Sequence, residues 1–529
     1  MKQTDWKARA KEWAYILLAG MIAHFALYSN WLTNPDGMAV FGEYYANGWE
    51  ISLGRFMLPV LDRIRDGMNA PILNVVFGMA LFAMAAVIIN EVLQIKNAFL
   101  RYAAAICVVS APLIANLASY YFMFLAYGIS MLAAVYSVRF LTKVKGWYAI
   151  PVSSVLLMIS LGLYQSSLGV AAGLCAMVLI LKLFDKAEKL SDIGKQFLRF
   201  IIYGIIGVGL YYGILKIVLN VKDIAIADYA GIGSFGISAF VSNFAQGIRQ
   251  AYADFAAYFY GDTIMSNAYY VKEAYWILSI LSAAAMAVHL IFNRKKTGRS
   301  LMAMALLAVL PIVCNCTVLI AANTTIILRT AWGMLMVVPF MGKLIWDAGE
   351  LLAKKARRIP FGKILKGVAG AACCILVVGN AAIDNMDALI MKTEEQKYTQ
   401  LSNRICMDVE KNSYYQAGNR VAIIGVPVFG NYPTNVMTDH SGYVPGYVSV
   451  YKKTNYYAQW GLLWNTPNMV YAGWKNIFTF QLGMNLNWCD EWEFNGIIET
   501  PEFSAMPNYP EEGSTAVIND VLVIKVSDM

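Results

Sequence analysis

Long apolar runs alternate along this chain with short connections, many of them basic. Runs such as 75–89, 201–210 and 279–292 contain almost no charged residues. A helix that crosses a bilayer needs about 20 mostly apolar residues, so repeated runs of this kind predict a polytopic α-helical membrane protein. We predict about eleven transmembrane helices, which lie near 13–33, 71–94, 98–117, 119–139, 147–163, 166–184, 199–220, 274–293, 301–321, 326–346 and 365–385.

Two long connections between these spans carry helical patterns of their own. In the loop 34–70, apolar residues recur every three or four positions, which predicts an amphipathic helix in the membrane interface: Leu53, Phe56, Met57, Val60, Leu61, Ile64 and Met68. Pro59 is expected to kink that helix or to start a new one. The loop 221–272 has a similar stripe, made of Phe244, Ile248, Tyr252, Phe255 and Phe259.

The pattern changes after the last span. Residues 393–410 fit a helix, 420–425 fit a strand, and 515–526 fit a hairpin that turns at Asn519-Asp520. We therefore predict a transmembrane domain over 1–391 and a small α+β domain over 392–529. Five of the thirteen tryptophans fall in this second region, where they serve either as a sugar-stacking platform or as the core of a small domain.

Charge supports this division and orients it. Only 14% of the 529 residues are charged, against roughly 25% in a soluble chain, while 59% are hydrophobic. Lys and Arg gather before the first span and in every second loop, which by the positive-inside rule predicts a cytoplasmic N-terminus and an extracytoplasmic region 392–529. The net charge of +8 thus reflects topology, with the lipid bilayer as partner and no nucleic acid.

Cysteines and known motifs add little. Of eight cysteines, only Cys406 and Cys489 fall in the region 392–529, where they could pair in an oxidising compartment. The chain has no P-loop, no Gly-rich dinucleotide motif after a strand and no HExxH. Its three histidines, His24, His289 and His440, lie in separate regions. We therefore predict no cofactor and no metal site.

Charged groups at the predicted outer surface are the remaining candidates for chemistry: Asp36, Glu43, Glu50, Arg55 and Arg329. Ionisable groups at membrane depth are costly and by default functional. An Arg fork suits a phosphate, and a carboxylate can take the proton of an attacking hydroxyl, so the set suits a lipid-phosphate donor.

Three of these residues also have a plain structural interpretation. Asp36 can serve its Asn-Pro-Asp-Gly turn, Arg55 can snorkel from an interfacial helix, and Arg329 can pair with a helix dipole or a lipid headgroup. Tyr164-Gln165 can be a simple hairpin turn between two spans. The residues alone leave an enzyme, a transporter and a scaffold open.

A family resemblance narrows this choice. The segments Asn34-Pro35-Asp36-Gly37 and 47–56, with its Gly54-Arg55-Phe56, resemble the first outer loop of bacterial serotype-converting glucosyltransferases of the Gtr type II family. The segment 161–166, with Tyr164-Gln165, is similar to the mid-chain Tyr-Gln element of that family. The resemblance covers most of the membrane region by layout and does not extend residue by residue to 392–529.

The resemblance implies a GT-C-like multispan enzyme in the bacterial plasma membrane. Such enzymes move a hexose, here glucose, from a polyprenyl-phosphate donor to a surface polysaccharide on the outer face, with inversion at the anomeric carbon. It implies that Asp36 is the catalytic residue and that Arg55 and Gln165 are signature positions. Arg329 is added by the physical argument as a second phosphate ligand, and Glu43, Glu50 and Tyr164 are further substrate-binding candidates.

Two alternatives stay open beside the transferase. A polysaccharide or lipid transporter, such as a flippase, would place ionisable groups near the bilayer midplane. Here the few charges within predicted spans, such as Glu91 and Lys216, lie near span ends, which favours an enzyme. Another envelope-assembly enzyme, such as a polysaccharide polymerase, would also use outer loops.

Overall fold

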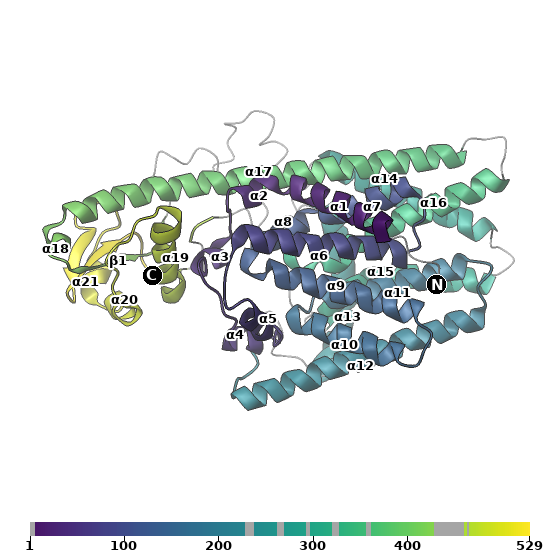
Figure 1. Cartoon of the computed structure of the whole chain (residues 1–529), viewed down its shortest axis with the longest axis horizontal. Coiled ribbons are helices and arrows are strands. Elements are labelled where there is room, and N and C mark those ends of the chain that lie inside the picture. Colours follow the sequence, from purple (N-terminus) through teal and green to yellow (C-terminus); the bar gives the residue numbers. More distant parts are fainter. Residues whose placement is uncertain are drawn as a thin grey trace.

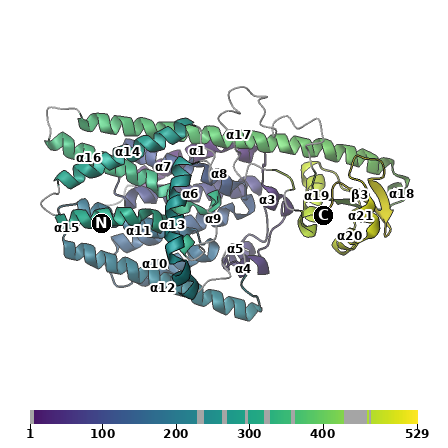
Figure 2. The same ribbon diagram turned by 180° about the vertical axis from the view of Figure 1, so that it is seen from behind.

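The structure is a computed structural model that describes residues 6–227, 237–261, 269–292, 297–319, 327–355, 361–427, 460–462 and 465–529. Most helices run side by side along the long axis and form a bundle, and the C-terminal region, residues 392–529, lies at one end of it (Figure 1). Seen from behind, only α13 (Ile237–Tyr260) crosses the bundle at a steep angle among the labelled helices (Figure 2). Its range confirms the predicted helix in the loop 221–272.

Among the described residues, seven helices are long and apolar enough to cross a membrane. Each overlaps a predicted span, and they are α6 (Pro71–Val92), α9 (Tyr121–Lys143), α11 (Ser167–Phe184), α12 (Leu190–Lys222), α14 (Tyr269–Phe292), α15 (Thr297–Cys314) and α17 (Phe361–Lys411). The predicted span 147–163 is the shorter apolar helix α10 (Ala149–Leu163). A membrane protein is therefore supported, and the count of eleven spans is not confirmed.

The predicted span 98–117 is broken rather than continuous. It consists of α7 (Ala98–Val109) and α8 (Pro112–Ala118), which meet at 44°. Pro112 causes the break, because it disfavours helical geometry at Ala111, whose backbone is extended. The first predicted span is likewise divided into α1 (Trp6–Ala23) and α2 (Phe25–Ser29).

A buried polar pair lies where these breaks meet. His24 separates α1 from α2, and its Nε2 is 2.8 Å from the Val109 carbonyl at the end of α7. Its Nδ1 is 3.1 Å from a carboxylate oxygen of Asp384 in α17, and both side chains are almost fully buried. The pair ties α17 to the two broken helices.

The predicted span 326–346 was wrong in its first half. Two 3-10 turns, η4 (Leu328–Thr330) and η5 (Trp332–Met336), precede α16 (Val337–Lys355). Close packing accounts for the irregular start, since a Cβ on Gly333 would lie 2.0 Å from the Cys314 carbonyl oxygen. Another short turn, η3 (Cys316–Leu319), follows α15.

The loop 34–70 holds three short helices instead of one long amphipathic helix. They are α3 (Pro35–Ala39), α4 (Gly48–Ser52) and α5 (Leu58–Ile64). Gly54 interrupts the predicted stripe, because its φ of +83° lies in the left-handed region that no helix tolerates. Pro59 sits in the first turn of α5, which confirms that it starts a new helix.

The C-terminal region contains a small sheet, as predicted. Strand β1 (Arg420–Ile424) pairs in parallel with β3 (Val521–Lys525), which pairs antiparallel with β2 (Thr515–Ile518). Asn519 and Asp520 both have positive φ, which confirms the predicted hairpin turn. Besides the end of α17, the described part of this region contains the helices α18 (Ser413–Gln416), α19 (Pro467–Asn476), α20 (Glu491–Ile498) and α21 (Pro501–Ala505).

Two observations bear on the predicted domain boundary and on the disulfide considered for the C-terminal region. The predicted boundary at 391/392 falls inside α17, which continues from the bundle into this region without a break. Cys406 and Cys489 are both free, so the possible disulfide is absent.

Trp460 and Trp474 are buried, whereas Trp492 is 72% exposed, so core packing accounts for part of the tryptophan cluster. Trp464 and His440 lie outside the described residues.

Candidate functional site

Asp36 lies in the first turn of α3, and this helix is anchored at its N-terminus. The side chain of Asn34 accepts a hydrogen bond from the Gly37 backbone N–H at 2.9 Å, so Asn34 is the N-cap. The predicted Asn-Pro-Asp-Gly turn is thus the start of a short helix. Asn34 is buried and Asp36 is half-buried, so the cap fixes the carboxylate at the edge of the bundle.

The junction between α8 and α9 connects this helix to Arg329. Ser119 accepts a hydrogen bond from the Asn34 backbone N–H at 3.2 Å and another from the Thr33 hydroxyl at 2.9 Å. Tyr121 donates from its hydroxyl to the Phe41 carbonyl, beyond the other end of α3, at 3.0 Å. The residue between them, Tyr120, accepts a hydrogen bond from Arg329. Three consecutive residues therefore hold Asp36 and Arg329 in fixed relation.

Arg329 projects from the 3-10 turn η4 rather than from a transmembrane helix as predicted. Its Nη1 donates to the Tyr120 hydroxyl at 2.5 Å, and its guanidinium lies 5.2 Å from the centre of that ring. The backbone carbonyl of Arg329 accepts hydrogen bonds from Trp332 Nε1 at 2.9 Å and from the Tyr164 hydroxyl at 3.3 Å. Both the backbone and the side chain of Arg329 are therefore fixed by aromatic residues.

A glycine turn presents Arg55 to the same aromatic residues. A Cβ on Gly54 would lie 2.3 Å from the Tyr211 hydroxyl and 2.7 Å from Gln165 Nε2, so both space and backbone conformation require glycine. Gln165 Nε2 donates to the Leu53 carbonyl at 2.6 Å and to the Tyr211 hydroxyl at 3.0 Å. The Gly-Arg-Phe and Tyr-Gln elements, distant in sequence, thus form one contact.

The guanidinium of Arg55 retains unused hydrogen-bonding capacity. It lies 5.0 Å from the centre of the Tyr164 ring, which stabilises its charge. Its Nε is buried and has no hydrogen-bond partner among the described residues. A buried donor without a partner is costly, so such a group calls for a ligand that accepts hydrogen bonds.

Tyr127 belongs to the aromatic cluster beside Arg55 and Arg329, and its hydroxyl lies within electrostatic range of both arginines and of Asp36. Its ring is 4.8 Å from Tyr164 and 5.8 Å from Trp332, and all three rings are buried. Tyr164 contacts Arg55 through its ring and the Arg329 carbonyl through its hydroxyl, so the two arginines border one aromatic cluster.

The two glutamate candidates have other surroundings. Both carboxylate oxygens of Glu50 are used, one by the Tyr44 hydroxyl at 2.8 Å and one by the Asn47 backbone N–H at 2.8 Å, which caps α4. Burial raises the pKa of Tyr44 above its usual range, and the charge and hydrogen bond of Glu50 add to the effect. Tyr44 therefore stays protonated and donates to Glu50. Glu43 is exposed, in a backbone bridge with Met68.

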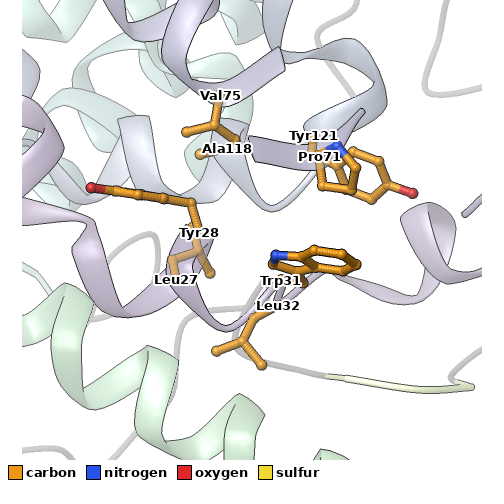
Figure 3. Close-up of a pocket in the computed structure, with 8 residues that line it drawn as sticks. All are labelled: Leu27, Tyr28, Trp31, Leu32, Pro71, Val75, Ala118 and Tyr121. Atoms are coloured by element: carbon orange, nitrogen blue, oxygen red, sulfur yellow. The ribbon is translucent and has the colours of Figure 1, made fainter. Parts of the chain in front are cut away.

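A small apolar pocket lies on another side of Tyr121. Its lining comes from α2, α6, α8, α9 and the segment after α2, and includes Leu27, Tyr28, Trp31, Leu32, Pro71, Val75, Ala118 and Tyr121. Figure 3 shows these side chains around the pocket. No charged side chain is among the residues that line it. Tyr121 lies between this pocket and the segment after α3.

No group of three or more His, Cys, Asp or Glu side chains that could hold a metal ion occurs in the described part of the chain. The candidate site itself offers one carboxylate, that of Asp36, and two guanidinium groups, those of Arg55 and Arg329. A carboxylate can accept a proton, and guanidinium groups bind oxyanions through two parallel hydrogen bonds. This combination suits the departure of a phosphate group.

A comparison with protein families decides the identity. The family model for Glucosyl transferase GtrII matches residues 25–340, more than half of the chain. The chain belongs to this family. Searches of curated proteins and of solved structures gave no match.

The GtrII match covers the whole candidate site. Asp36, Arg55, Tyr164, Gln165 and Arg329 all lie within 25–340, whereas the C-terminal region lies beyond it. The chain is accordingly a membrane protein with transmembrane helices, and it belongs to a glycosyltransferase family. The GtrII match does not cover the C-terminal region, so the role of that region must be argued from contacts.

Several residues of the site carry no sequence signal of their own. Tyr120, Tyr127 and Trp332 look like ordinary apolar residues of predicted spans, and Ser119 is one serine among many. One available signal was missed. Tyr120 and Tyr127 are seven residues apart, so a helix that includes both places them on one face.

Proposed function

We propose that this protein transfers a hexose, glucose, from a polyprenyl-phosphate donor to a hydroxyl of a surface polysaccharide on the outer side of the plasma membrane. Membership in the GtrII family supports sugar transfer. The proposal goes further on two contacts: Arg55 and the Arg329 backbone both meet Tyr164, and the junction Ser119–Tyr121 links Arg329 to the helix that carries Asp36. A lipid-phosphate donor needs cations for its leaving group and one base for the acceptor.

The proposed step is a single inverting displacement. The acceptor oxygen forms a bond to the anomeric carbon as the bond from that carbon to the phosphate oxygen breaks. The acceptor proton goes to the Asp36 carboxylate, and the electron pair of the broken bond leaves with the polyprenyl phosphate. Arg55 and Arg329 stabilise the charge that develops on this phosphate.

The unused Nε of Arg55 supports its role as a phosphate ligand. A phosphate oxygen in that place would satisfy a buried donor and neutralise a half-buried cation together. The Arg55 guanidinium lies 5.0 Å from the centre of the Tyr164 ring, and its planar fork suits two-point contact with a phosphate. Tyr164 contacts the Arg55 guanidinium, and Gln165 holds the turn that carries Arg55. In this proposal both residues contribute to the substrate site by positioning Arg55.

The arrangement of the two ends of the bundle supports the proposed orientation. The N-terminus and the C-terminal region lie at opposite ends (Figure 1). Near the N-terminus, Glu91 pairs with Arg9 and Arg139, and Glu12 pairs with Arg101 at 2.5 Å. We place this basic end in the cytoplasm, and α3, the acceptor and the extracytoplasmic domain 392–529 at the other.

An in vitro transfer assay tests the function. Purified full-length protein in nanodiscs receives polyprenyl-phosphate glucose and candidate acceptor polysaccharides, and transferred glucose is measured. We expect transfer from the lipid-phosphate donor and none from a nucleotide sugar. Asp36→Asn serves as the inactive control. Absence of transfer with several hexoses, together with measured lipid or glycan transport, would contradict the enzyme assignment.

A further inference from the structure

The C-terminal region contacts the helix that carries Asp36. Asn476, the last residue of α19, donates hydrogen bonds from its side-chain Nδ2 to the carbonyls of Met38 at 2.9 Å and Ala39 at 3.0 Å. These two carbonyls belong to the last turn of α3. The side chain therefore joins residues more than 400 positions apart in sequence.

This contact matters because α3 cannot hold its shape alone. The helix has five residues, whereas an isolated helix shorter than about 12 residues is marginal in water. The last carbonyls of a helix lack partners within it. Asn34 caps the N-terminal end from within the loop, and Asn476 supplies the missing partners at the other end.

A second contact lies one turn further along. The residues after α19 form a π-helical turn, η7 (Ile477–Gln481), a wide turn that often marks functional sites. Phe480 from this turn has its ring 5.7 Å from Phe41, just beyond α3. A Cβ on Gly42 would lie 2.5 Å from Phe480 Cζ, so glycine leaves room for the ring.

The contacting helix is itself firmly attached to the C-terminal region. Trp474 is fully buried, and its Nε1 donates to the Gly425 carbonyl at 3.0 Å, at the end of β1. Its ring also lies 5.9 Å from Tyr398 of α17. A continuous set of contacts thus runs from α17 through Trp474 and Asn476 to α3.

We propose that Asn476 is a positioning residue for Asp36, and that docking of the C-terminal region on α3 orients the base for the transfer step. The inference rests on the proposed function of Asp36. It assigns the C-terminal region a part in the chemistry itself, because Asn476 acts on α3 and touches neither phosphate ligand among its described contacts.

Activity of the full-length protein gives the first test. Asn476→Ala removes both hydrogen bonds, and we expect kcat to fall roughly 10- to 100-fold, as for misplacement of a catalytic group, with the KM for the lipid donor unchanged. Asn468→Ala is the matched control, since Asn468 is an exposed residue of the same helix. Wild-type kcat in Asn476→Ala would overturn the inference.

A compensation test separates positioning from general destabilisation. Gly42→Ala places a methyl group against Phe480 and should lower kcat. The double variant Gly42→Ala with Phe480→Leu relieves that clash, and we expect it to recover activity. If the double variant is no more active than Gly42→Ala, the clash with Phe480 is not the cause of the lower kcat.

Amide hydrogen exchange tests the contact between Asn476 and α3 without relying on the transfer assay. In wild-type protein, the amides of residues 33–42 should be protected, and Asn476→Ala should exchange them at least about tenfold faster, while Asn468→Ala does not. Unchanged exchange in Asn476→Ala overturns the docking role. Faster exchange with wild-type kcat overturns the positioning role. Absence of any transferase activity in wild-type protein refutes the proposed function. The exchange rates of residues 33–42 still decide whether contact with the C-terminal region orders α3.

Discussion

Arg55 and Arg329 bind aromatic residues in different ways. Arg329 donates a hydrogen bond to Tyr120 and stacks on the same ring. Arg55 stacks on Tyr164 and keeps a buried Nε without a partner among the described residues. A phosphate should therefore gain more from Arg55, whose donor is still unsatisfied, and should use Arg329 mainly through its charge.

Replacing Asp36 tests the base at the scale of one residue. Asp36→Asn keeps the size of the side chain and the cap by Asn34, so folding should persist. Since a general base contributes typically 100- to 10,000-fold, we expect kcat to fall by about 100-fold or more. The measurement is transfer of labelled glucose, with thermal unfolding as a check on the fold.

Glu43→Gln and Glu50→Gln give the comparison for that prediction. Glu43 is exposed, so its variant should behave like wild type. Glu50→Gln weakens the α4 cap and the bond from Tyr44, so we expect it to lower thermal stability more than it lowers activity per folded molecule. If Asp36→Asn stays active and a Glu variant is inactive, the base is that glutamate.

Arg55→Lys and Arg329→Lys test the phosphate ligands. Lysine keeps the charge and loses the planar fork, so charge-assisted hydrogen bonds worth roughly 1.5–3 kcal/mol each are lost. We expect the KM for the lipid donor to rise in both variants, and more in Arg55→Lys. Initial rates at varied donor concentration measure this change. An unchanged donor KM would mean that the arginine has a structural role only.

At the scale of elements, the turn at Gly54 decides where Arg55 points. Gly54→Ala forces a methyl group into the space of Tyr211 and Gln165 and strains a φ of +83°. Strain of this kind costs about 1–3 kcal/mol, so we expect a lower thermal unfolding temperature and loss of activity together. Both can be measured on the same purified sample.

Gly209→Ala is the matched control for that change. Gly209 is an exposed glycine of α12 with open space around its Cα, and alanine stabilises a helix interior by about 0.5–1 kcal/mol relative to glycine. We therefore expect unchanged or higher stability and normal activity. Equal losses in both variants would remove the special role assigned to the Gly54 turn.

Local patterns predicted some elements well. The hairpin at Asn519-Asp520 and the strand at β1 follow from short-range alternation and turn chemistry, and both are confirmed. The helix breaks at Pro112 and Gly54 were missed, although both residues are visible in the sequence. Apolar periodicity continues across each of them and by itself predicts an unbroken helix. The backbone preference of a single Pro or Gly overrides that pattern at both places.

The candidate site residues can be picked out from the sequence, whereas their arrangement in space cannot. Asp36, Arg55 and Arg329 stand out as charges in or near apolar segments, and the family match covers all three. The junction Ser119–Tyr121 links Arg329 to the helix that carries Asp36, through contacts between residues about 80 to 200 positions apart in the chain, and Tyr164 links Arg55 to Arg329. Neither periodicity nor local propensity reports such long-range contacts.

At the scale of the whole molecule, orientation in the membrane can be tested by labelling. Lys195→Cys lies at the predicted cytoplasmic end and Glu512→Cys in the C-terminal region, and both positions are exposed. With a membrane-impermeant maleimide on intact cells whose outer membrane is permeabilised, we expect Glu512→Cys to react and Lys195→Cys to react only after lysis. The reverse pattern would invert the proposed topology. The predicted cytoplasmic segment 294–299 begins outside the described residues, so Lys195 is the better reporter.

The continuity of α17 has a consequence for where the C-terminal region lies relative to the bundle. At 1.5 Å per residue, this helix of 51 residues is about 76 Å long, against a hydrocarbon core of about 30 Å. It contains no proline, and its last glycine is Gly379. About 46 Å of this helix exceeds the hydrocarbon core, so α17 is a continuous rigid strut that sets the distance between the transmembrane bundle and the C-terminal sheet.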